Sequence, residues 1–180
     1  MGRAFQSLAG RLLVSHPLQR DANFDRSVVL LHSHDRDGAL GVILNRPLGQ
    51  ALGQAQAAFA SSPLSDVPLH FGGPVATDRM AFGGWSFPSG ASSVLRYGVH
   101  REEAPQLARD PTFRLFAYVG YSGWGGGQLE EELRLGAWVT CDFEARFMAH
   151  EGEQLWRALL VHHRPDQRLA MDSPDDPGLN

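Results

Sequence analysis

The chain contains no lysine, only one cysteine and no long apolar run, and each absence argues against a class of function. All 16 basic residues are arginine, so a Schiff-base lysine, a phosphate-loop lysine and a Ser–Lys pair are excluded. The lone Cys141 cannot form an internal disulfide, which is typical of a reducing compartment. No run of about 18 apolar residues is present, and the first residues lack the pattern of a signal peptide. We therefore expect a cytoplasmic protein without a membrane span.

The charge distribution argues against direct nucleic-acid binding. The formal net charge is −4, and the arginines are spread along the whole chain. Proteins that bind DNA or RNA usually gather basic side chains on one face, because phosphate neutralisation supplies most of their non-specific affinity. The sequence contains neither such a cluster nor a basic recognition helix.

The length and the hydrophobic pattern predict one α+β domain over residues 1–164. Residues 165–180 are rich in Pro and Asp and lack periodicity, so we expect them to form a disordered tail. Asp37–Gly38 lies between two apolar runs and predicts a hairpin. Since early strands pair through this hairpin and later ones alternate with helices, a mixed sheet is expected. Apolar runs predict strands at 12–14, 28–31, 39–44, 69–71, 80–82, 93–97, 113–119 and 137–141, and three-and-four spacing predicts helices at 48–59, 102–109, 128–133 and around 155–160.

The segment at 120–130, GYSGWGGGQLE, is the strongest indication of a site. It leads from a predicted strand into a helix through glycines, which is a design that holds anions on backbone N–H groups. However, three consecutive glutamates in the first helical turn would repel an anion. The alternative is a shaped turn in which Trp124 fills the core. The candidate ligand-binding residues here are Tyr121, Trp124, Gln128 and Glu130.

Two further segments carry candidate binding groups. Asn45 and Arg46 follow a predicted strand, and Arg46 could form a forked contact with a carboxylate or phosphate. The alternative for Arg46 is an internal ion pair with an acid such as Glu130. Gly72 and Gly73 predict a tight turn that could line a pocket through backbone groups alone.

Metal and nucleophile chemistry find little support in the sequence. His32 and His34 share one face of a strand, but only His70 is available as a further ligand, so no metal site and no cofactor are expected. His34 remains a candidate for ligand binding. Adjacent histidines at 162 and 163 would point in different directions on a helix. Ser122 lacks the second glycine of a nucleophile elbow, and Cys141 lies inside a predicted strand without a neighbouring base.

These segments together resemble the YqgE/AlgH family of bacterial proteins. The similar segments are DANF at 21–24, VVLL with His34 at 28–34, GALGVILNRP at 38–47, GGPV at 72–75 and GYSGW with GQLE at 120–130. The family usually has Ala at position 122 and often Pro at position 126, where this chain has Ser122 and Gly126. The first departure weakens any catalytic interpretation of Ser122.

The resemblance implies a fold more than a reaction. It implies one domain with branched sheets, a barrel-like part and short flanking helices. Members of the AlgH type are described as candidate regulators of transcription linked to alginate production, whereas the family has no agreed biochemical activity. We therefore expect a non-catalytic binding or regulatory module for a protein partner or a small anionic ligand, which would affect transcription only indirectly. The alternative is an enzyme for a small anionic substrate, with a pocket between residues 45–47 and 121–130.

Overall fold

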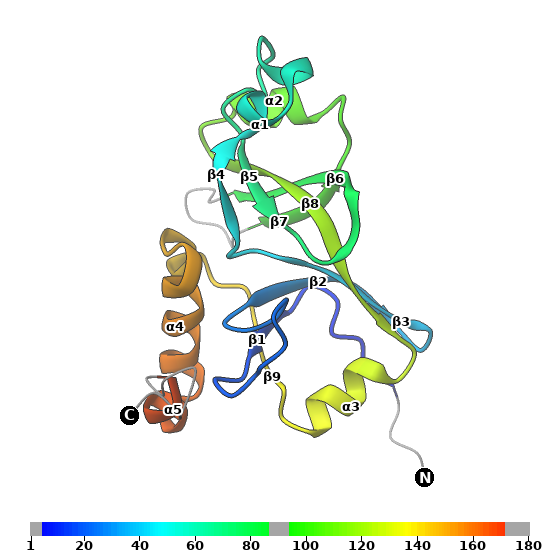
Figure 1. The fold of residues 1–180 in the computed structure, drawn as a ribbon, viewed down its shortest axis with the longest axis vertical. Helices are drawn as coiled ribbons and strands as arrows, with labels where there is room; N and C mark the ends of the chain where they lie inside the picture. Colours follow the sequence, from blue (N-terminus) through cyan, green and yellow to red (C-terminus); the bar gives the residue numbers. More distant parts are fainter. Residues whose placement is uncertain (1–4, 87–93, 172–180) are drawn as a thin grey trace.

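One long strand, β8 (Phe113–Gly125), belongs to two small sheets and joins them (Figure 1). The computed structural model describes residues 5–86 and 94–171. The other strands are β1 (Leu12–Ser15), β2 (Val28–Asp35), β3 (Gly38–Ile43), β4 (Pro47–Ala51), β5 (Pro68–Phe71), β6 (Val75–Ser86), β7 (Val94–Val99) and β9 (Trp138–Cys141). The helices are α1 (Leu52–Ala55), α2 (Ala104–Arg109), α3 (Gln128–Arg134), α4 (Gly152–His163) and α5 (Arg168–Met171), with 3₁₀ turns η1 (Ala57–Phe59), η2 (Ala145–Ala149) and η3 (Pro165–Gln167).

The sheet is mixed, mostly antiparallel and branched. Its strand order is β4-β5-β8-β3-β2-β1-β9, and β6 pairs with both β8 and β7 off this path. Among the strands that the structure describes, β5 and β8 are the one parallel pair. The N-terminal part of β8 lies between β5 and β6, whereas its C-terminal part pairs with β3. This arrangement, half-curled into a barrel and flanked by short helices, confirms the predicted α+β class.

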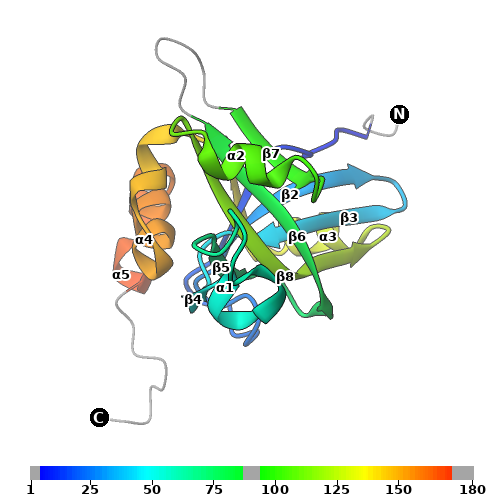
Figure 2. The same ribbon diagram turned by 90° about the horizontal axis from the view of Figure 1, so that it is seen from above.

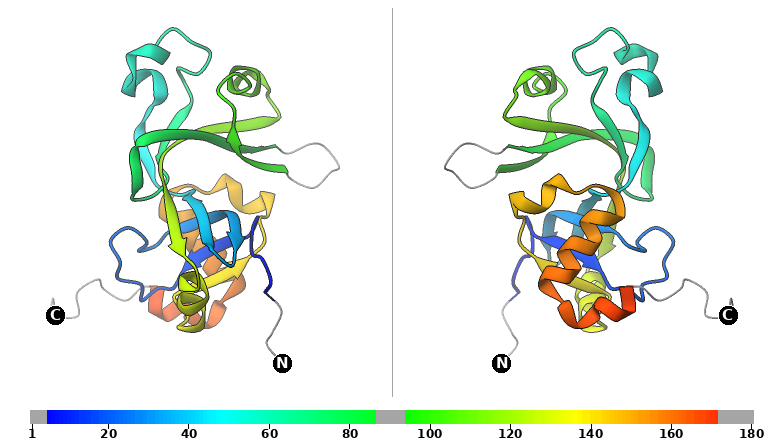
Figure 3. Two further views of the ribbon diagram at one scale, coloured as in Figure 1. Left: turned by 90° about the vertical axis from the view of Figure 1, so that its right-hand side faces the viewer. Right: turned by 90° about the vertical axis from the view of Figure 1, so that its left-hand side faces the viewer.

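The molecule has two parts, and its core continues from one into the other, since Trp85 of β6 and Phe116 of β8 belong to the same buried cluster as Trp156 of α4. The upper part in Figure 1 carries β4 to β7 with α1 and α2, and the lower part carries β1, β2, β3 and β9 with α3 and α4. Figure 2 shows α4 and α5 on one side of the molecule and the β2–β3 hairpin projecting on the other. Figure 3 shows that β8 runs from one part into the other. The predicted hairpin is confirmed, since Asp35 pairs with Gly38.

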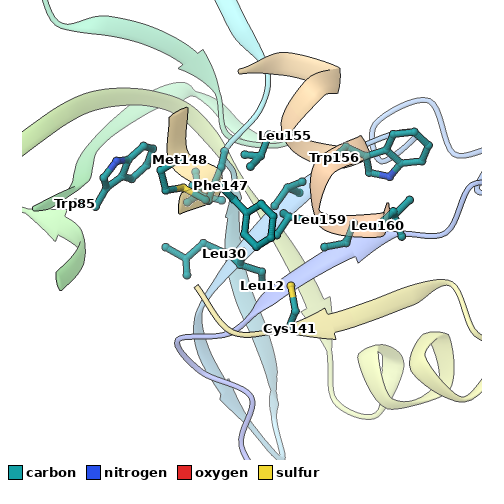
Figure 4. Packing of buried hydrophobic residues seen from close by; sticks show 14 of the residues in the cluster. Leu12, Leu30, Trp85, Cys141, Phe147, Met148, Leu155, Trp156, Leu159 and Leu160 are labelled. Carbon is teal, nitrogen blue, oxygen red and sulfur yellow. The ribbon is translucent and has the colours of Figure 1, made fainter. Parts of the chain in front are cut away.

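Helix α4 forms because its apolar side chains recur on one face. Leu155, Trp156, Leu159 and Leu160 are all buried and pack against strands β1 and β2 (Figure 4). The Trp156 indole N–H also donates to the Ser15 carbonyl at 2.9 Å, so its polar atom is satisfied inside the core. The opposite face of the same sheet packs against Leu129 of α3, together with Trp124 and Trp138.

The predicted helix at 48–59 is largely wrong. Residues 47–51 instead form strand β4, which pairs with β5 through Pro47 opposite His70 and Ala51 opposite Pro68. Leu48 is 44% exposed, so it does not belong to the apolar face that its spacing suggested. Only Leu52 and Phe59 of that face are buried, in α1 and η1. Pairing along a sheet edge has overridden a weak local periodicity.

The segment expected to be disordered begins with ordered structure. Residues 165–171 form η3 and α5, and Met171 is 3% exposed in the core beneath α4. Burial of this side chain supplies the stabilisation that the local sequence lacks. Residues 172–180 lie outside the described residues, as does Ser93 at the start of a predicted strand. No helix in the described part of the chain is both long and apolar enough to cross a membrane.

Candidate functional site

Glycines of the segments at 72–75 and 120–130 lie where the backbones of these two segments cross in close contact. The Gly72 carbonyl accepts the Ile43 N–H at 2.9 Å, and the Gly72 N–H donates to the Val119 carbonyl at 2.7 Å. A Cβ on Gly72 would lie 2.4 Å from the Gly120 oxygen, and one on Gly73 would lie 2.2 Å from the Tyr121 carbonyl carbon. These glycines are therefore needed for close packing of chain segments, and they leave no room for a ligand at the crossing.

Ser122 and Asn45 are occupied within the same region. The fully buried Ser122 hydroxyl donates to the Gly72 carbonyl at 3.2 Å. The Asn45 amide accepts the Val28 N–H at 2.8 Å and donates to the carbonyls of Arg26 and Gly152 at 2.9 and 3.0 Å. Asn45 thus ties the start of β2 to the start of α4, and its polar atoms face the protein itself.

Arg46 does not pair with Glu130, which was one of the two alternatives from the sequence. Its guanidinium donates to the Asp25 carbonyl, and it lines a cavity of about 330 Å³ with Arg20, Ala22 and Asp25. Glu130 lies at a different cavity. The segments that resemble the family therefore contact one another through their backbones. Their charged side chains, Arg46 and Glu130, line two different cavities.

Trp124 and Gln128 face an internal carboxylate that the sequence analysis missed. The indole N–H groups of Trp124 and Trp138 both donate to Glu132 Oε2, at 2.9 and 2.7 Å. The Gln128 amide donates to Glu132 Oε1 at 2.9 Å and accepts the Gly125 N–H at 3.1 Å. Hydrogen bonds to an ionised acceptor are stronger than neutral ones. The four-residue spacing of Gln128 and Glu132 on a predicted helix could have indicated their contact.

His34 and Glu130 form a hydrogen-bonded pair across 96 residues of sequence. The Leu8 N–H donates to His34 Nδ1 at 3.0 Å, so this nitrogen carries the lone pair. The proton of the neutral ring is then on Nε2, which donates to Glu130 Oε1 at 2.9 Å. The His34 side chain is 2% exposed, whereas that of Glu130 is 45% exposed. A buried imidazole therefore orients an accessible carboxylate.

This carboxylate lies in a cavity of about 540 Å³ between the N-terminal segment, the end of β2 and α3. Phe5 covers His34 edge-on, with 5.0 Å between ring centroids. Arg36 is exposed, and its guanidinium has no ion-pair partner among residues 5–86 and 94–171. The full lining is Phe5, Gln6, Leu8, His34, Arg36, Glu130 and Leu133. We call it the His34 cavity.

Two other groups considered for chemistry, Cys141 and His70, are buried. Burial raises the pKa of the Cys141 thiol to about 12. Burial lowers the pKa of His70, whose Nδ1–H donates to the Leu44 carbonyl at 2.9 Å. The His70 ring packs edge-on against Phe116 and Tyr118.

The expectation that His162 and His163 point in different directions is wrong. Their ring centroids are 4.7 Å apart, and Glu144 reaches the same point. Both residues belong to the last turn of α4, so their side chains converge toward Glu144 although they leave the helix at adjacent positions.

Comparison with known proteins places the chain in a family. The family model described as AlgH-like matches residues 12–168. The chain belongs to the AlgH-like family. A UPF0301 protein of Streptomyces coelicolor is 39% identical, with 97% of this chain and 96% of the relative covered. A UPF0301 protein of Chlorobium luteolum is 33% identical, with 96% and 94% covered. The resemblance to the YqgE/AlgH family is thus confirmed.

The AlgH-like fold is also found in solved structures. The chain superposes on a crystal structure of a protein from Corynebacterium diphtheriae with a TM-score of 0.69, 20% identity, and 96% and 95% of the two chains covered. It superposes on the solution structure of AlgH from Pseudomonas aeruginosa with a TM-score of 0.65, 24% identity, and 98% and 100% covered. At these identities the comparisons establish the shared fold alone.

Proposed function

We propose that this AlgH-like protein is a non-catalytic binding module of the cytoplasm, and that its ligand site is the His34 cavity. The observation that carries the proposal is the fixed His34–Glu130 pair at a cavity of about 540 Å³, beside Arg36, which has no ion-pair partner among the residues that the structure describes. Ligand sites commonly combine apolar walls with a few well-placed polar groups. Here the apolar walls are Phe5, Leu8 and Leu133.

The chemistry of the cavity favours a small organic anion with an apolar part. Arg36 supplies a planar guanidinium that can hold a carboxylate or phosphate through two hydrogen bonds. The repulsion expected from Glu130 is reduced, because one of its oxygens accepts the His34 Nε2–H. The same carboxylate can accept a hydrogen bond from a hydroxyl or amine on the ligand.

Two features support binding rather than catalysis. Both ring nitrogens of His34 are engaged, with Leu8 and with Glu130, so neither is available to a substrate proton. The Ser122 hydroxyl and the Cys141 thiol are buried, and neither contacts a base. The enzymatic alternative is favoured only by Glu130, an accessible carboxylate beside a histidine. The proposed pocket between residues 45–47 and 121–130 gains no support, because Arg46 lines another cavity.

We further propose that any role in transcription is indirect. The net charge of −4 and the scattered arginines disfavour DNA as the direct partner. A ligand-dependent contact with another protein fits the cavity and the charge better. A specific, salt-sensitive gel shift at nanomolar protein concentration would overturn this part of the proposal.

The experiment is a thermal-shift screen against nucleotides, sugar phosphates and apolar carboxylates, followed by NMR titration of each compound that raises the melting temperature. Arg36→Met should weaken binding at least tenfold by removing the forked contact, roughly the 1.5–3 kcal/mol of a charged hydrogen bond. Arg109→Met, at an exposed position at the end of α2, is the matched control and should bind as wild type does. A compound bound equally by both variants would contradict the assignment. Turnover of a bound compound that is lost in Glu130→Gln would favour the enzyme.

A further inference from the structure

The C-terminal end of α4 meets the segment that leads into η2. Glu144, His162 and His163 each bring a ligating atom to one point, and these atoms lie within 4.8 Å of one another. The two imidazole rings are nearly perpendicular, at 83°, so their nitrogens can approach the point from different sides. Within the described part of the chain, this is the one place where three His, Cys, Asp or Glu side chains converge so closely.

Both histidines have a ring nitrogen whose lone pair can bind a metal ion. The Arg146 guanidinium donates to His162 Nε2 at 2.8 Å, so this nitrogen carries a lone pair. His163 Nε2 is buried without a hydrogen-bond partner in the described structure, and it lies 3.7 Å from Glu144 Oε1. A ring nitrogen with a lone pair is the donor that a metal ion requires.

We propose that Glu144, His162 and His163 bind a divalent transition-metal ion of the zinc type. Two imidazoles and one carboxylate are a common zinc ligand set, which leaves a fourth position for water. Bonds of about 2.0–2.2 Å require tetrahedral ligand atoms roughly 3.5 Å apart, so the side chains need to close by only about 1 Å. The negative end of the α4 dipole also favours a cation here. Hard ions such as Mg²⁺ prefer oxygen-rich sites and are not expected.

Arg146 is the internal competitor for this site. Its guanidinium contacts Glu144 Oε2 at 2.9 Å as well as His162 Nε2, so a cationic group already lies among the proposed ligand atoms. The Arg146 side chain is 57% exposed and rests on the Phe147 ring at 4.8 Å. Because it is long and exposed, it can leave the site without disturbing the core. The metal and the guanidinium should therefore exclude each other.

The bound ion would fasten the segment after β9 to the end of α4. Glu144 immediately precedes η2, whose Phe147 and Met148 are buried against α4. An ion that binds only the folded chain stabilises it by mass action. The melting temperature should therefore rise with the concentration of free Zn²⁺.

The test is isothermal titration of the full chain with Zn²⁺, with Co²⁺ absorption as a report on tetrahedral geometry. His162→Ala and His163→Ala should each weaken Zn²⁺ binding by more than about tenfold, since even the loss of an outer-shell partner costs that much. His100→Ala, at an exposed histidine outside the group, is the matched control and should leave binding unchanged. Circular dichroism of each variant confirms that the fold is retained.

Arg146→Met separates a metal site from a simple ion-pair network. The methionine retains the apolar stem on Phe147 and removes the competing charge, so Zn²⁺ should bind several-fold more tightly. The proposal is overturned if Arg146→Met binds Zn²⁺ no better than wild type, or if the double variant His162→Ala/His163→Ala binds as wild type does. It is equally overturned if Mg²⁺ binds as tightly as Zn²⁺.

Discussion

Gly73 lies directly against the backbone of Tyr121, and a Cβ at position 73 would be 2.2 Å from the Tyr121 carbonyl carbon. Gly73 also has φ +151°, a conformation that residues with side chains rarely adopt. The crossing connects the turn after β5 to the point where β8 leaves one sheet for the other. The close approach of the two chain segments therefore explains why glycine is needed at position 73, and no ligand is required for this explanation.

Substitution at this crossing should destabilise the fold severely. Gly73→Ala combines a backbone clash with strain, and we expect a loss of more than about 3 kcal/mol in the free energy of unfolding, measured by urea titration. Gly125→Ala, at the end of the same long strand, has open space around the new methyl group and should change stability by less than about 0.5 kcal/mol. Equal losses in the two variants would contradict this explanation.

Replacing Glu132 should loosen the two tryptophans that it holds. In Glu132→Gln an amide N–H₂ replaces one of the oxygens that accept Trp124, Trp138 and Gln128. At least one donor loses its acceptor, at a cost of about 1–3 kcal/mol. Urea unfolding followed by tryptophan fluorescence measures the loss.

The neighbouring glutamate provides the control for this substitution. Glu131 is exposed and pairs only with Arg134 on the same helix, so Glu131→Gln should unfold close to wild type. A Glu132→Gln protein as stable as Glu131→Gln would show that the shared carboxylate contributes little.

Local patterns in the sequence predicted much of the fold. Apolar runs located the strands of the described chain other than β4, and Asp37–Gly38 located the β2–β3 hairpin. The helix expected at 48–59 failed because pairing of β4 with β5, which places Pro47 opposite His70, decides the conformation of this segment. A one-dimensional periodicity carries no information about such a partner.

The candidate site was only partly predictable, because its contacts are long-range. His34 and Glu130 were both singled out, but their pairing across the fold is not visible in either local segment. Glu144 lies well before His162 and His163 in the sequence, and only the packing of η2 against α4 brings them together. The alternative of a pocket shared by Arg46 and Gln128 gains no support, because Arg46 bonds to the Asp25 carbonyl and Gln128 bonds to Glu132.

His70 should make the stability of the fold depend on pH. Burial lowers its pKa in the folded state below the ordinary value near 6.5, so the unfolded state binds more protons between the two values. The stabilisation from neutral His70 is therefore complete above about pH 6.5 and is lost as the pH falls through the folded pKa. His70→Asn keeps a donor for the Leu44 carbonyl and removes the titrating ring.

Urea titrations at about pH 7.5 and pH 5.5 test this dependence. Wild type should lose more stability on acidification than His70→Asn does. The pKa values of His16 and His163 are also lowered by burial, but both residues are present in either protein, so the difference isolates His70. His100→Asn should retain the full pH dependence. An unchanged slope in His70→Asn would refute the assignment.

Cys141 should react with thiol reagents only when the fold opens. The thiolate is the nucleophilic form, and a pKa raised to about 12 by burial leaves very little of it at pH 8. The side chain is also 2% exposed and packed among the apolar residues beneath α4 (Figure 4). Since the chain has one cysteine, absorbance after addition of an aromatic disulfide reagent reports this residue alone. Native protein should label at the slow rate of local or global opening, and protein in strong denaturant should label as fast as glutathione.

The destabilising substitution Gly73→Ala should accelerate labelling of Cys141 in the native protein, whereas Gly125→Ala should not, because only the first shifts the folding equilibrium. Native labelling as fast as that of denatured protein would mean that the core around β9 and α4 is open in solution.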